Sequence, residues 1–278
     1  MSYNLKKGDR GQEVSRLQKR LCGLTVDGIF GSKTRTAVED FQSKQGLVVD
    51  GIAGTNTLRE LGIPVLLGID VSAWNGNISW DKVAKSDVKY AWIKHTEGQT
   101  HANRGHVENV LAARNNNVIA GAYHFGRPDT NRDENLKDAI REAEWFLAHY
   151  NPKPGDLIPV LDVEKGMKTD DNYNAEWALK WLERVEDAVG CKPMVYTARW
   201  AEQLYLMHAK KDLLDELATY PVWWASYNEG CSPERWTGKI WKEWDVWQFT
   251  GSGTTSGIKG RCDQNWLAGG QLTNLRIS

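Results

Sequence analysis

Several signals that would assign a protein class are absent or sparse in this sequence of 278 residues. It has 4 cysteines and no C-x-x-C pair, so a disulfide scaffold is not indicated and we expect free thiols. The alternative is a pairing among Cys191, Cys231 and Cys262 after release. No apolar run approaches the ~20 residues of a transmembrane helix, so we expect no membrane insertion. The 35 basic and 36 acidic residues give a net charge of −1, which argues against a nucleic-acid partner.

Common motifs of metal and serine hydrolases are missing as well. The 6 histidines form no H-E-x-x-H pattern, and no G-x-S-x-G motif occurs. The sequence therefore gives no support to a zinc amidase or peptidase, and we expect neither a metal nor another cofactor. It contains instead 41% hydrophobic residues and 14 tryptophans, enough for a large core and for aromatic surfaces that suit sugar rings.

An internal repeat occupies the first part of the chain. Residues 26–34 (VDGIFGSKT) recur as residues 49–57 (VDGIAGTNT), each with an Asp-Gly turn and a Ser or Thr that we expect to cap a helix. Helices are predicted at about 32–45 and 55–61, and apolar residues at helical spacing predict an earlier one. We therefore expect a small N-terminal three-helix domain over residues 1–62, followed by a short linker.

This first domain resembles the peptidoglycan-binding domain type 1 that stands beside many wall hydrolases. The resemblance rests on residues 8–11, Val14, residues 17–18, 27–31, Thr34, residues 37–38, 41–42 and 50–54. It implies non-catalytic binding of bacterial peptidoglycan. The alternative is a structural cap without affinity, because the Asp-Gly turns and the apolar stripe are explained by folding alone.

Residues 65–278 show strands alternating with helices, the pattern of a parallel α/β fold. Helices are predicted at about 104–115, 133–150 and 177–189. Eight strand candidates in this length suggest an irregular TIM-like (β/α) barrel, with helices sparse after the fifth strand. The predicted strands lie at 65–72, 88–94, 118–125, 157–164, 193–197, 222–227, 244–249 and near 262–266.

The apolar run from Leu157 ends in two acids, Asp162 and Glu164, at i, i+2. Side chains alternate along a strand, so both acids project to the same side. Paired carboxyl groups resist ionisation together, which keeps one protonated near neutral pH, as glycosidases require. A solvated acidic turn is the alternative. Polar residues at or just past the other strand ends favour a site, because this rim carries the chemistry of such barrels. They are Asp70, Glu97, Tyr123, His124, Tyr196, Gln248 and Asp263.

Five motifs of this region resemble glycoside hydrolase family 25, the Chalaropsis-type lysozymes. They are Gly68–Ser72, Lys94–Gly98, Gly121–Phe125, Leu161–Glu164 and Trp247–Phe249, in the family's order. The resemblance implies an N-acetylmuramidase that cuts the β-1,4 bond between N-acetylmuramic acid and N-acetylglucosamine. By motif match Glu164 is the general acid, and Asp162, Asp70 and Asp263 share the site. Which aspartate assists Glu164, and whether the reaction retains or inverts the anomeric configuration, stay open.

Further positions are candidates for substrate contact. Glu97 either orients the carboxyl cluster or pairs with Lys94. Arg127 stands in a turn that can meet carboxylates of the substrate, whereas His124 is expected to be structural. The remaining candidates are aromatic or amide side chains that can stack on or hydrogen-bond sugars, with core packing as the alternative: Tyr123, Tyr196, Trp223, Tyr227, Trp247 and Gln248.

The combination of modules resembles a phage endolysin. The N-terminal residues are polar with no apolar segment behind them, so we expect synthesis in the host cytoplasm without a signal peptide and action on the cell wall after release. A monomer is expected, with a holin partner only if the endolysin interpretation holds. The alternatives are a wall-binding adaptor on an inactive barrel and a chitinase-like hydrolase.

Overall fold

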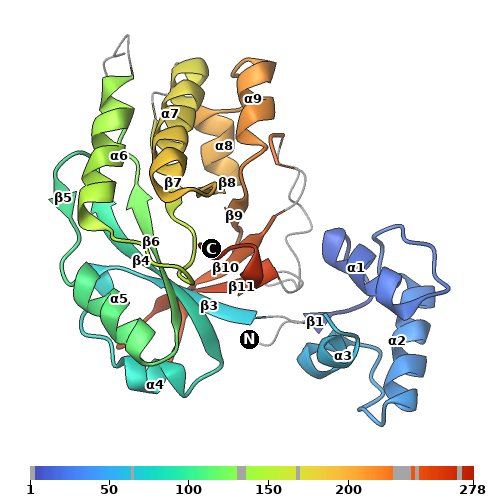
Figure 1. Cartoon of the computed structure of the whole chain (residues 1–278). Coiled ribbons are helices and arrows are strands. Elements are labelled where there is room, and N and C mark those ends of the chain that lie inside the picture. The colour runs from blue at the N-terminus through green and yellow to red at the C-terminus, as the bar shows by residue number, and fades with distance from the viewer. Residues whose placement is uncertain are drawn as a thin grey trace.

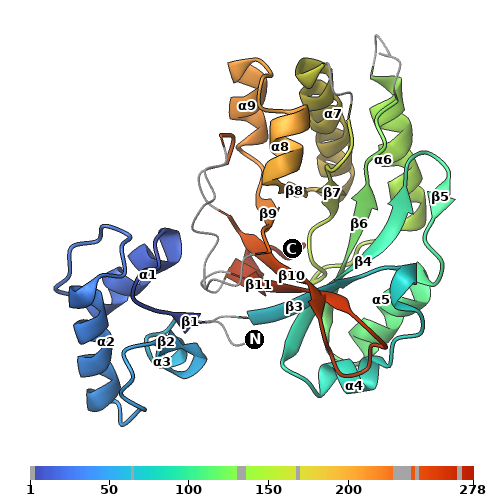
Figure 2. The same cartoon turned by 180° about the vertical axis from the view of Figure 1, so that it is seen from behind.

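A computed structural model describes residues 4–63, 66–129, 136–166, 170–227, 239–241, 244–267 and 271–278. Within these ranges the chain forms a two-stranded sheet near its N-terminus and a larger sheet that contains the other strands. Figures 1 and 2 show the N-terminal elements that include the two-stranded sheet, coloured blue, beside the larger sheet and its helices. No helix in the described ranges is both long and apolar enough to cross a membrane.

The larger sheet closes into a barrel of eight strands. The ring consists of β3 (Leu66–Val71), β4 (Val88–Glu97), β6 (Ile119–Phe125), β7 (Val160–Asp162), β8 (Met194–Ala198), β9 (Val222–Ala225), β10 (Val246–Gly253) and β11 (Cys262–Leu267). Its strands pair in parallel from β3 through β4 and β6 to β10, whereas β11 runs antiparallel to both β10 and β3 and so completes the ring. A short strand, β5 (His101–Ala102), extends β4 outside the ring.

All eight predicted strands are present, and the mixed α/β barrel is confirmed. The helices outside the ring are longest in the first half and short after β8, and the described residues following β9 contain no α-helix (Figure 1). The helices are α4 (Trp80–Ala84), α5 (His106–Asn115), α6 (Lys137–His149), α7 (Asp171–Val189), α8 (Arg199–Tyr205) and α9 (Lys211–Leu217), with 3-10 turns η1 (Ala73–Asn75) and η2 (Gln271–Thr273). Helices α4, α8 and α9 and strand β5 were not predicted from the sequence.

Large aromatic side chains fill the barrel interior. Tyr90, Trp92 and Trp223 are fully buried, and the Trp92 and Trp223 rings lie 4.8 Å apart between centroids. Gly68 on β3 makes room for this layer, since a Cβ atom there would lie 2.0 Å from the Tyr90 ring. Barrels of this size have interiors packed with side chains. The packed layer leaves polar side chains to gather above it, at the carboxyl ends of the strands.

The N-terminal module, residues 4–63, contains α1 (Gln12–Leu21), α2 (Ser32–Lys44) and α3 (Thr55–Glu60), with β1 (Asn4–Leu5) paired to β2 (Ala53–Gly54). The three predicted helices are therefore present. The expected caps are shifted by one residue, because Gly31 and Gly54 occupy the N-cap positions and make no side-chain cap bond. Ser32 and Thr55 are instead the first helical residues.

The repeat is held by two matching glutamines. The Gln42 amide nitrogen donates to Asp50 Oδ1 (2.8 Å), the Ile52 carbonyl (2.9 Å) and Thr57 Oγ1 (3.1 Å), and its oxygen accepts from the Gly51 amide (3.0 Å). Gln18 repeats this pattern around Asp27, Gly28, Ile29 and Thr34. Each Asp-Gly turn is thus fastened to the preceding helix by a buried side chain that satisfies several polar groups at once.

The cysteines in the described ranges form no disulfide. Cys22 is exposed, Cys191 is partly buried and Cys262 is buried, and all three are free. Cys231 lies outside the described residues.

Candidate active site

A cavity of ≈ 280 Å³ opens at the carboxyl ends of the barrel strands. Four carboxyl groups line it: Asp70 on β3, Asp162 at the end of β7, Glu164 two residues beyond, and Asp263 on β11. Among the described residues that line the cavity, Lys94 is the only cation. Acidic groups outnumber basic ones at a place where water access is reduced, so the ionisation of these groups is strongly coupled to their surroundings.

Asp70 is held rigidly at the floor of this cavity. Its Oδ2 accepts hydrogen bonds from Gln248 Nε2 (2.9 Å) and Asn265 Nδ2 (2.8 Å). Asn265 in turn accepts from Trp223 Nε1 (2.8 Å). Gln248 Oε1 accepts from the hydroxyls of two tyrosines, Tyr196 (2.8 Å) and Tyr227 (2.7 Å). This network fixes the amide orientations and leaves the Asp70 carboxyl with a single position.

The four carboxyl groups are all harder to ionise than in water. Burial raises the pKa of Asp70 well above its ordinary value, and the neighbouring Asp263 raises it further. Burial likewise raises the pKa of Asp263, against an opposing interaction with Asp70. Two buried carboxyl groups on facing strand positions resist ionising together. Ionisation of one therefore disfavours ionisation of the other.

Asp162 and Glu164 form the second pair. Burial raises the pKa of Asp162 well above its ordinary value, with Glu164 as the next cause. The pKa of Glu164 is also raised, first by burial and then by the charge of Asp263. The Asp162 Oδ1 atom is buried and has no hydrogen-bond partner within the described part of the chain. A buried carboxyl oxygen without a partner is costly to charge, which agrees with the raised pKa of Asp162.

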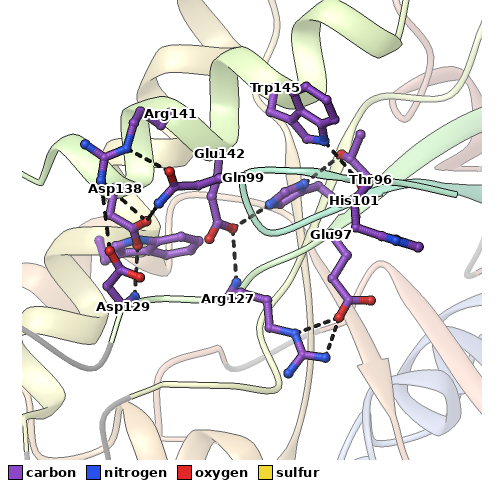
Figure 3. Close-up of polar contacts among 12 residues, drawn as sticks. Thr96, Glu97, Gln99, His101, Arg127, Asp129, Asp138, Arg141, Glu142 and Trp145 are labelled. Carbon is purple, nitrogen blue, oxygen red and sulfur yellow. Dashed lines mark hydrogen bonds and ion pairs between the residues drawn. The ribbon is translucent and has the colours of Figure 1, made fainter.

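Lys94 connects this cavity to an ion-pair network beside it. Its ammonium group pairs with Glu97 Oε2 and lies 4.7 Å from the Phe125 ring centroid. The other Glu97 oxygen pairs with the Arg127 guanidinium, as Figure 3 shows. Glu97, which does not line the cavity, thus balances two cations, and these positive charges lower its pKa against the effect of burial.

A buried polar link supports the same region from behind. His124 Nε2 lies 2.8 Å from Glu142 Oε2, and His124 Nδ1 lies 2.7 Å from Thr96 Oγ1. Glu142 also accepts from the Arg127 backbone amide (3.0 Å, Figure 3). Burial lowers the pKa of His124 to about 3 and raises the pKa of Glu142 to about 8. At neutral pH Glu142 therefore keeps its proton and His124 is uncharged. The same contacts tie α6 to the loop after β6.

Residues 69–258 match the family model for glycosyl hydrolases family 25, which covers more than half of the chain. The chain belongs to glycosyl hydrolases family 25. Residues 10–61 match the model for a putative peptidoglycan binding domain. This order of modules agrees with the resemblances read from the sequence.

Individual relatives support the same family. The uncharacterized protein YegX of Escherichia coli K12 is 28% identical over 266 residues, covering 91% of each chain. Lysozyme M1 of Streptomyces globisporus is 26% identical over 221 residues, covering 76% of this chain and 70% of that protein. A family 25 glycosyl hydrolase structure from Bacillus anthracis is 26% identical with a TM-score of 0.59, covering 76% of this chain and 94% of that one.

Most of the residues singled out from the sequence meet at the cavity of this family 25 barrel. In addition to the four acids they are Tyr123, Tyr196, Trp223, Tyr227 and Gln248. Glu97 and Arg127 do not line it, because they pair with each other and Glu97 also pairs with Lys94. His124 is buried in the link to Glu142, as expected of a structural histidine.

Trp247 is the clearest departure from the sequence-based expectation. Its side chain is only 2% exposed and does not line the cavity, and its indole N–H donates to the Ser226 carbonyl (2.9 Å). Neighbours on a strand point to opposite faces, so Gln248 faces the barrel interior and Trp247 packs outside it, near Trp244 and Phe249. Trp247 is therefore a packing residue in this structure, and its expected sugar contact is not supported.

Four lining residues were not among the predicted site residues: Ser72, Trp74, Lys94 and Phe125. Lys94 and Phe125 end two predicted strands, so the rule that placed acids at the rim applies to them equally. Ser72 and Trp74 directly follow the first barrel strand, where only the acid was given weight. All four stand at or just past a strand end, and they were left out because the choice favoured other residue types at that rim.

Proposed function

We propose that this chain is a peptidoglycan-degrading lysozyme, an N-acetylmuramidase that hydrolyses the β-1,4 bond between N-acetylmuramic acid and N-acetylglucosamine. The observation that carries the proposal is the group of four carboxyl residues around one cavity in a family 25 barrel. Lysozyme M1, a relative over most of this chain, supports the substrate class. The match of residues 10–61 to a putative peptidoglycan binding domain supports bacterial peptidoglycan as the polymer that is bound.

Glu164 is the general acid of this proposal. A general acid must be protonated at the working pH, and burial together with Asp263 raises the pKa of Glu164 in the required direction. The protonated carboxyl donates its proton to the glycosidic oxygen as the bond to the leaving sugar breaks. Positive charge then develops on the ring carbon, and a nearby negative or polar oxygen must stabilise it.

Asp162 is the assisting residue that the geometry favours. Asp162 lines the cavity two residues before Glu164, whereas Asp70 Oδ2 is already occupied by Gln248 and Asn265. In this proposal Asp162 accepts a hydrogen bond from the substrate's acetamido N–H and orients that group toward the reacting carbon. Asp70 and Asp263 set the electrostatic environment of Glu164. A substrate acetamido oxygen acting in this way gives net retention.

The aromatic and amide groups around the acids suit a sugar substrate. Tyr123, Tyr196 and Trp223 form the cavity wall, with the Tyr196 and Trp223 rings 4.8 Å apart between centroids. Tyr227 is 60% exposed at the mouth. Such rings offer flat apolar faces and polar edges to the alternating faces and hydroxyls of a pyranose. No cofactor takes part in this proposal.

The domain organisation is proposed on the same basis, with a wall-binding domain at residues 1–62 and the catalytic barrel at residues 65–278. The first keeps the enzyme on the polymer while the second cleaves it, a gain in effective concentration that needs no contact between their sites. Endolysin action in phage release is the biological role proposed for this pairing, with a monomer as the acting form and a holin as the expected partner for release from the cytoplasm.

Glu164→Gln tests the catalytic assignment. The variant keeps the size and most hydrogen bonds of the side chain but cannot donate the proton, so we expect lysis of cell-wall suspensions to fall about 10²–10⁴-fold. Thermal stability and wall adsorption should stay near wild type. The matched control is Glu183→Gln, a half-buried α7 residue that pairs with Lys180 away from the cavity lining. Substantial lysis by folded Glu164→Gln, or efficient cleavage of unsubstituted chitin oligosaccharides by the wild type, would contradict the proposal.

A further inference from the structure

Trp74 is the most exposed large apolar side chain of the described residues, with 96% of its surface accessible, yet it lines the catalytic cavity. It lies on η1, directly after β3 and close to Asp70 in sequence. Exposed tryptophan gains nothing from core burial, so its placement at the rim of a polymer-cleaving site calls for a ligand contact.

The turn that carries Trp74 is rigid. Ser72 and Asn75 form a capping box, in which Ser72 Oγ accepts from the Trp74 amide (3.3 Å) and Asn75 Oδ1 accepts from the Ser72 amide (2.9 Å). Asn75 Nδ2 also donates to the Arg261 carbonyl (3.1 Å), just before β11, the strand that pairs with β3. The Ala73 amide donates to the buried side chain of Asn103 (3.1 Å). Trp74 thus projects from a turn fixed on several sides.

A second hollow lies on the other side of this turn. Its volume is ≈ 570 Å³, and Ala73 and Gly76 of the turn contribute to its wall. Its polar lining comes from the loop after the turn and from the segment at the start of α5. These residues are Asn77, Arg104, Glu108 and Asn109. Asn109 is oriented by accepting from Trp80 Nε1 (2.9 Å). The turn with Trp74 therefore separates two adjoining hollows, of which only the first contains the carboxyl cluster.

We propose that Trp74 is a stacking platform for a sugar ring of the glycan strand beyond those flanking the cleaved bond, and that the strand continues into the hollow lined by Asn77, Arg104, Glu108 and Asn109. This inference rests on the proposed glycosidase function and extends its substrate from a single linkage to a longer segment of strand. The indole face supplies apolar contact, and the amide and charged groups beyond it match sugar hydroxyls and acetamido groups.

A rigid aromatic platform favours a repetitive polymer over a small ligand. A pre-ordered turn adds binding without the cost of ordering it on association. Energy from sugars remote from the reacting bond is available to the transition state, so longer strands should be cut faster. The second hollow has no acidic pair like the first, since Glu108 is the only acid among its described lining residues. Its role is therefore to bind rather than to cleave.

The test compares kcat/KM for the shortest muropeptide-derived oligosaccharide that wild type cuts with kcat/KM for long glycan strands. For Trp74→Ala we expect the long-to-short ratio to fall about tenfold, which corresponds to ~1.4 kcal/mol. Trp74→Phe, which keeps a ring, should recover much of that ratio. The matched control is Trp200→Ala, because Trp200 is 48% exposed after β8 but lines neither hollow. All four proteins should unfold at the same temperature.

The same comparison on strands freed of stem peptides by an amidase separates sugar from peptide recognition. For Trp74→Ala, the long-to-short ratio of kcat/KM should fall by the same factor on these strands as on strands that keep their peptides. A fall that disappears once the peptides are removed would overturn the sugar assignment, and an equal loss on short and long substrates would place Trp74 at the cleaved bond instead. An unchanged ratio in Trp74→Ala would reject the platform while leaving the glycosidase intact. Failure of the proposed function is distinct, because wild type would then cut neither substrate.

Discussion

Asp70 and Asp263 lie directly opposite each other on the antiparallel strands β3 and β11. Like charges at such a cross-strand position repel and would weaken the strand pairing that closes the barrel. Burial raises the pKa of both carboxyl groups, and the charge of Asp263 raises the pKa of Asp70 further. Burial thus disfavours the doubly charged pair, so closure of the barrel and the electrostatics of the site involve the same two residues.

Asp263→Asn should shift the pH dependence of catalysis. After burial, the charge of Asp263 is the largest cause that raises the pKa of Glu164. The amide removes that charge and keeps the size of the side chain, so the pKa of Glu164 falls. Because the protonated form is active, the alkaline limb of the kcat/KM profile should move to lower pH. Asp215→Asn, on the exposed face of α9, should leave the limb in place. An unmoved limb in Asp263→Asn would show that Asp263 does not act on Glu164.

Lys94→Met should shift the same limb in the opposite direction. The Lys94 ammonium lowers the pKa of both Asp162 and Glu164. Without it the acid keeps its proton to higher pH, so activity should persist further into the alkaline range, whatever the change in maximal rate. The informative quantity is the position of the limb, measured on soluble oligosaccharides across the pH range. A shift of the alkaline limb in the same direction for Asp263→Asn and Lys94→Met would contradict these electrostatic roles.

The sequence predicted the strands and the acids well for one physical reason. A buried parallel strand is a short apolar run, and polar residues follow where the run reaches the rim, as at Asp70 and Asp162. The same reasoning could not assign faces within a short aromatic strand, where Trp247 and Gln248 differ only in which side they occupy. It also could not show that Glu97 would be taken up by Arg127, because that pair joins β4 to a loop 30 residues away in the chain.

Short elements escaped prediction for a different reason. Helices α4, α8 and α9 have five to seven residues, too few for apolar periodicity to separate them from loops. The expected N-caps Ser32 and Thr55 were misplaced because glycine in an extended conformation serves as the cap in both repeats. Trp74 was missed because an exposed aromatic residue in a turn has no periodic signal.

Glu142→Gln should change how stability depends on pH. Burial raises the pKa of Glu142 from 4.5 to about 8, so the folded state keeps a proton that the unfolded chain has released. The stability that this group contributes is present below its ordinary pKa and is lost as pH rises toward the folded value. Wild type should therefore lose up to about 1.4 kcal/mol per pH unit in this window relative to Glu142→Gln.

Denaturant unfolding at about pH 5 and pH 8 measures this difference, with Glu144→Gln as the exposed control on the same helix. The carboxyl cluster contributes equally to all three proteins, so it cancels in the comparison. Parallel stability curves for wild type and Glu142→Gln would mean that Glu142 is already ionised in the folded protein at neutral pH.

Gln42→Ala should weaken the N-terminal module and spare the barrel. The substitution leaves the Asp50 and Gly51 amides and the Ile52 carbonyl without the partner that Gln42 supplies. Losing several partly buried hydrogen bonds at once should cost about 2–4 kcal/mol. We expect reduced adsorption to purified walls at 37 °C, a temperature chosen as roughly physiological, while hydrolysis of soluble oligosaccharides stays unchanged. Gln45→Ala, an exposed glutamine at the end of α2, is the control.

The most direct test of the central claim is mass spectrometry of the soluble fragments that the enzyme releases from purified peptidoglycan, after reduction with borohydride. The proposed muramidase leaves reducing ends on muramic acid, so the fragments should carry reduced muramic acid. Reduced glucosamine ends would move the cleaved bond within the glycan. New free amino groups without new reducing ends would contradict a glycosidase altogether, and with it the roles proposed for Glu164, Asp162, Asp70 and Asp263.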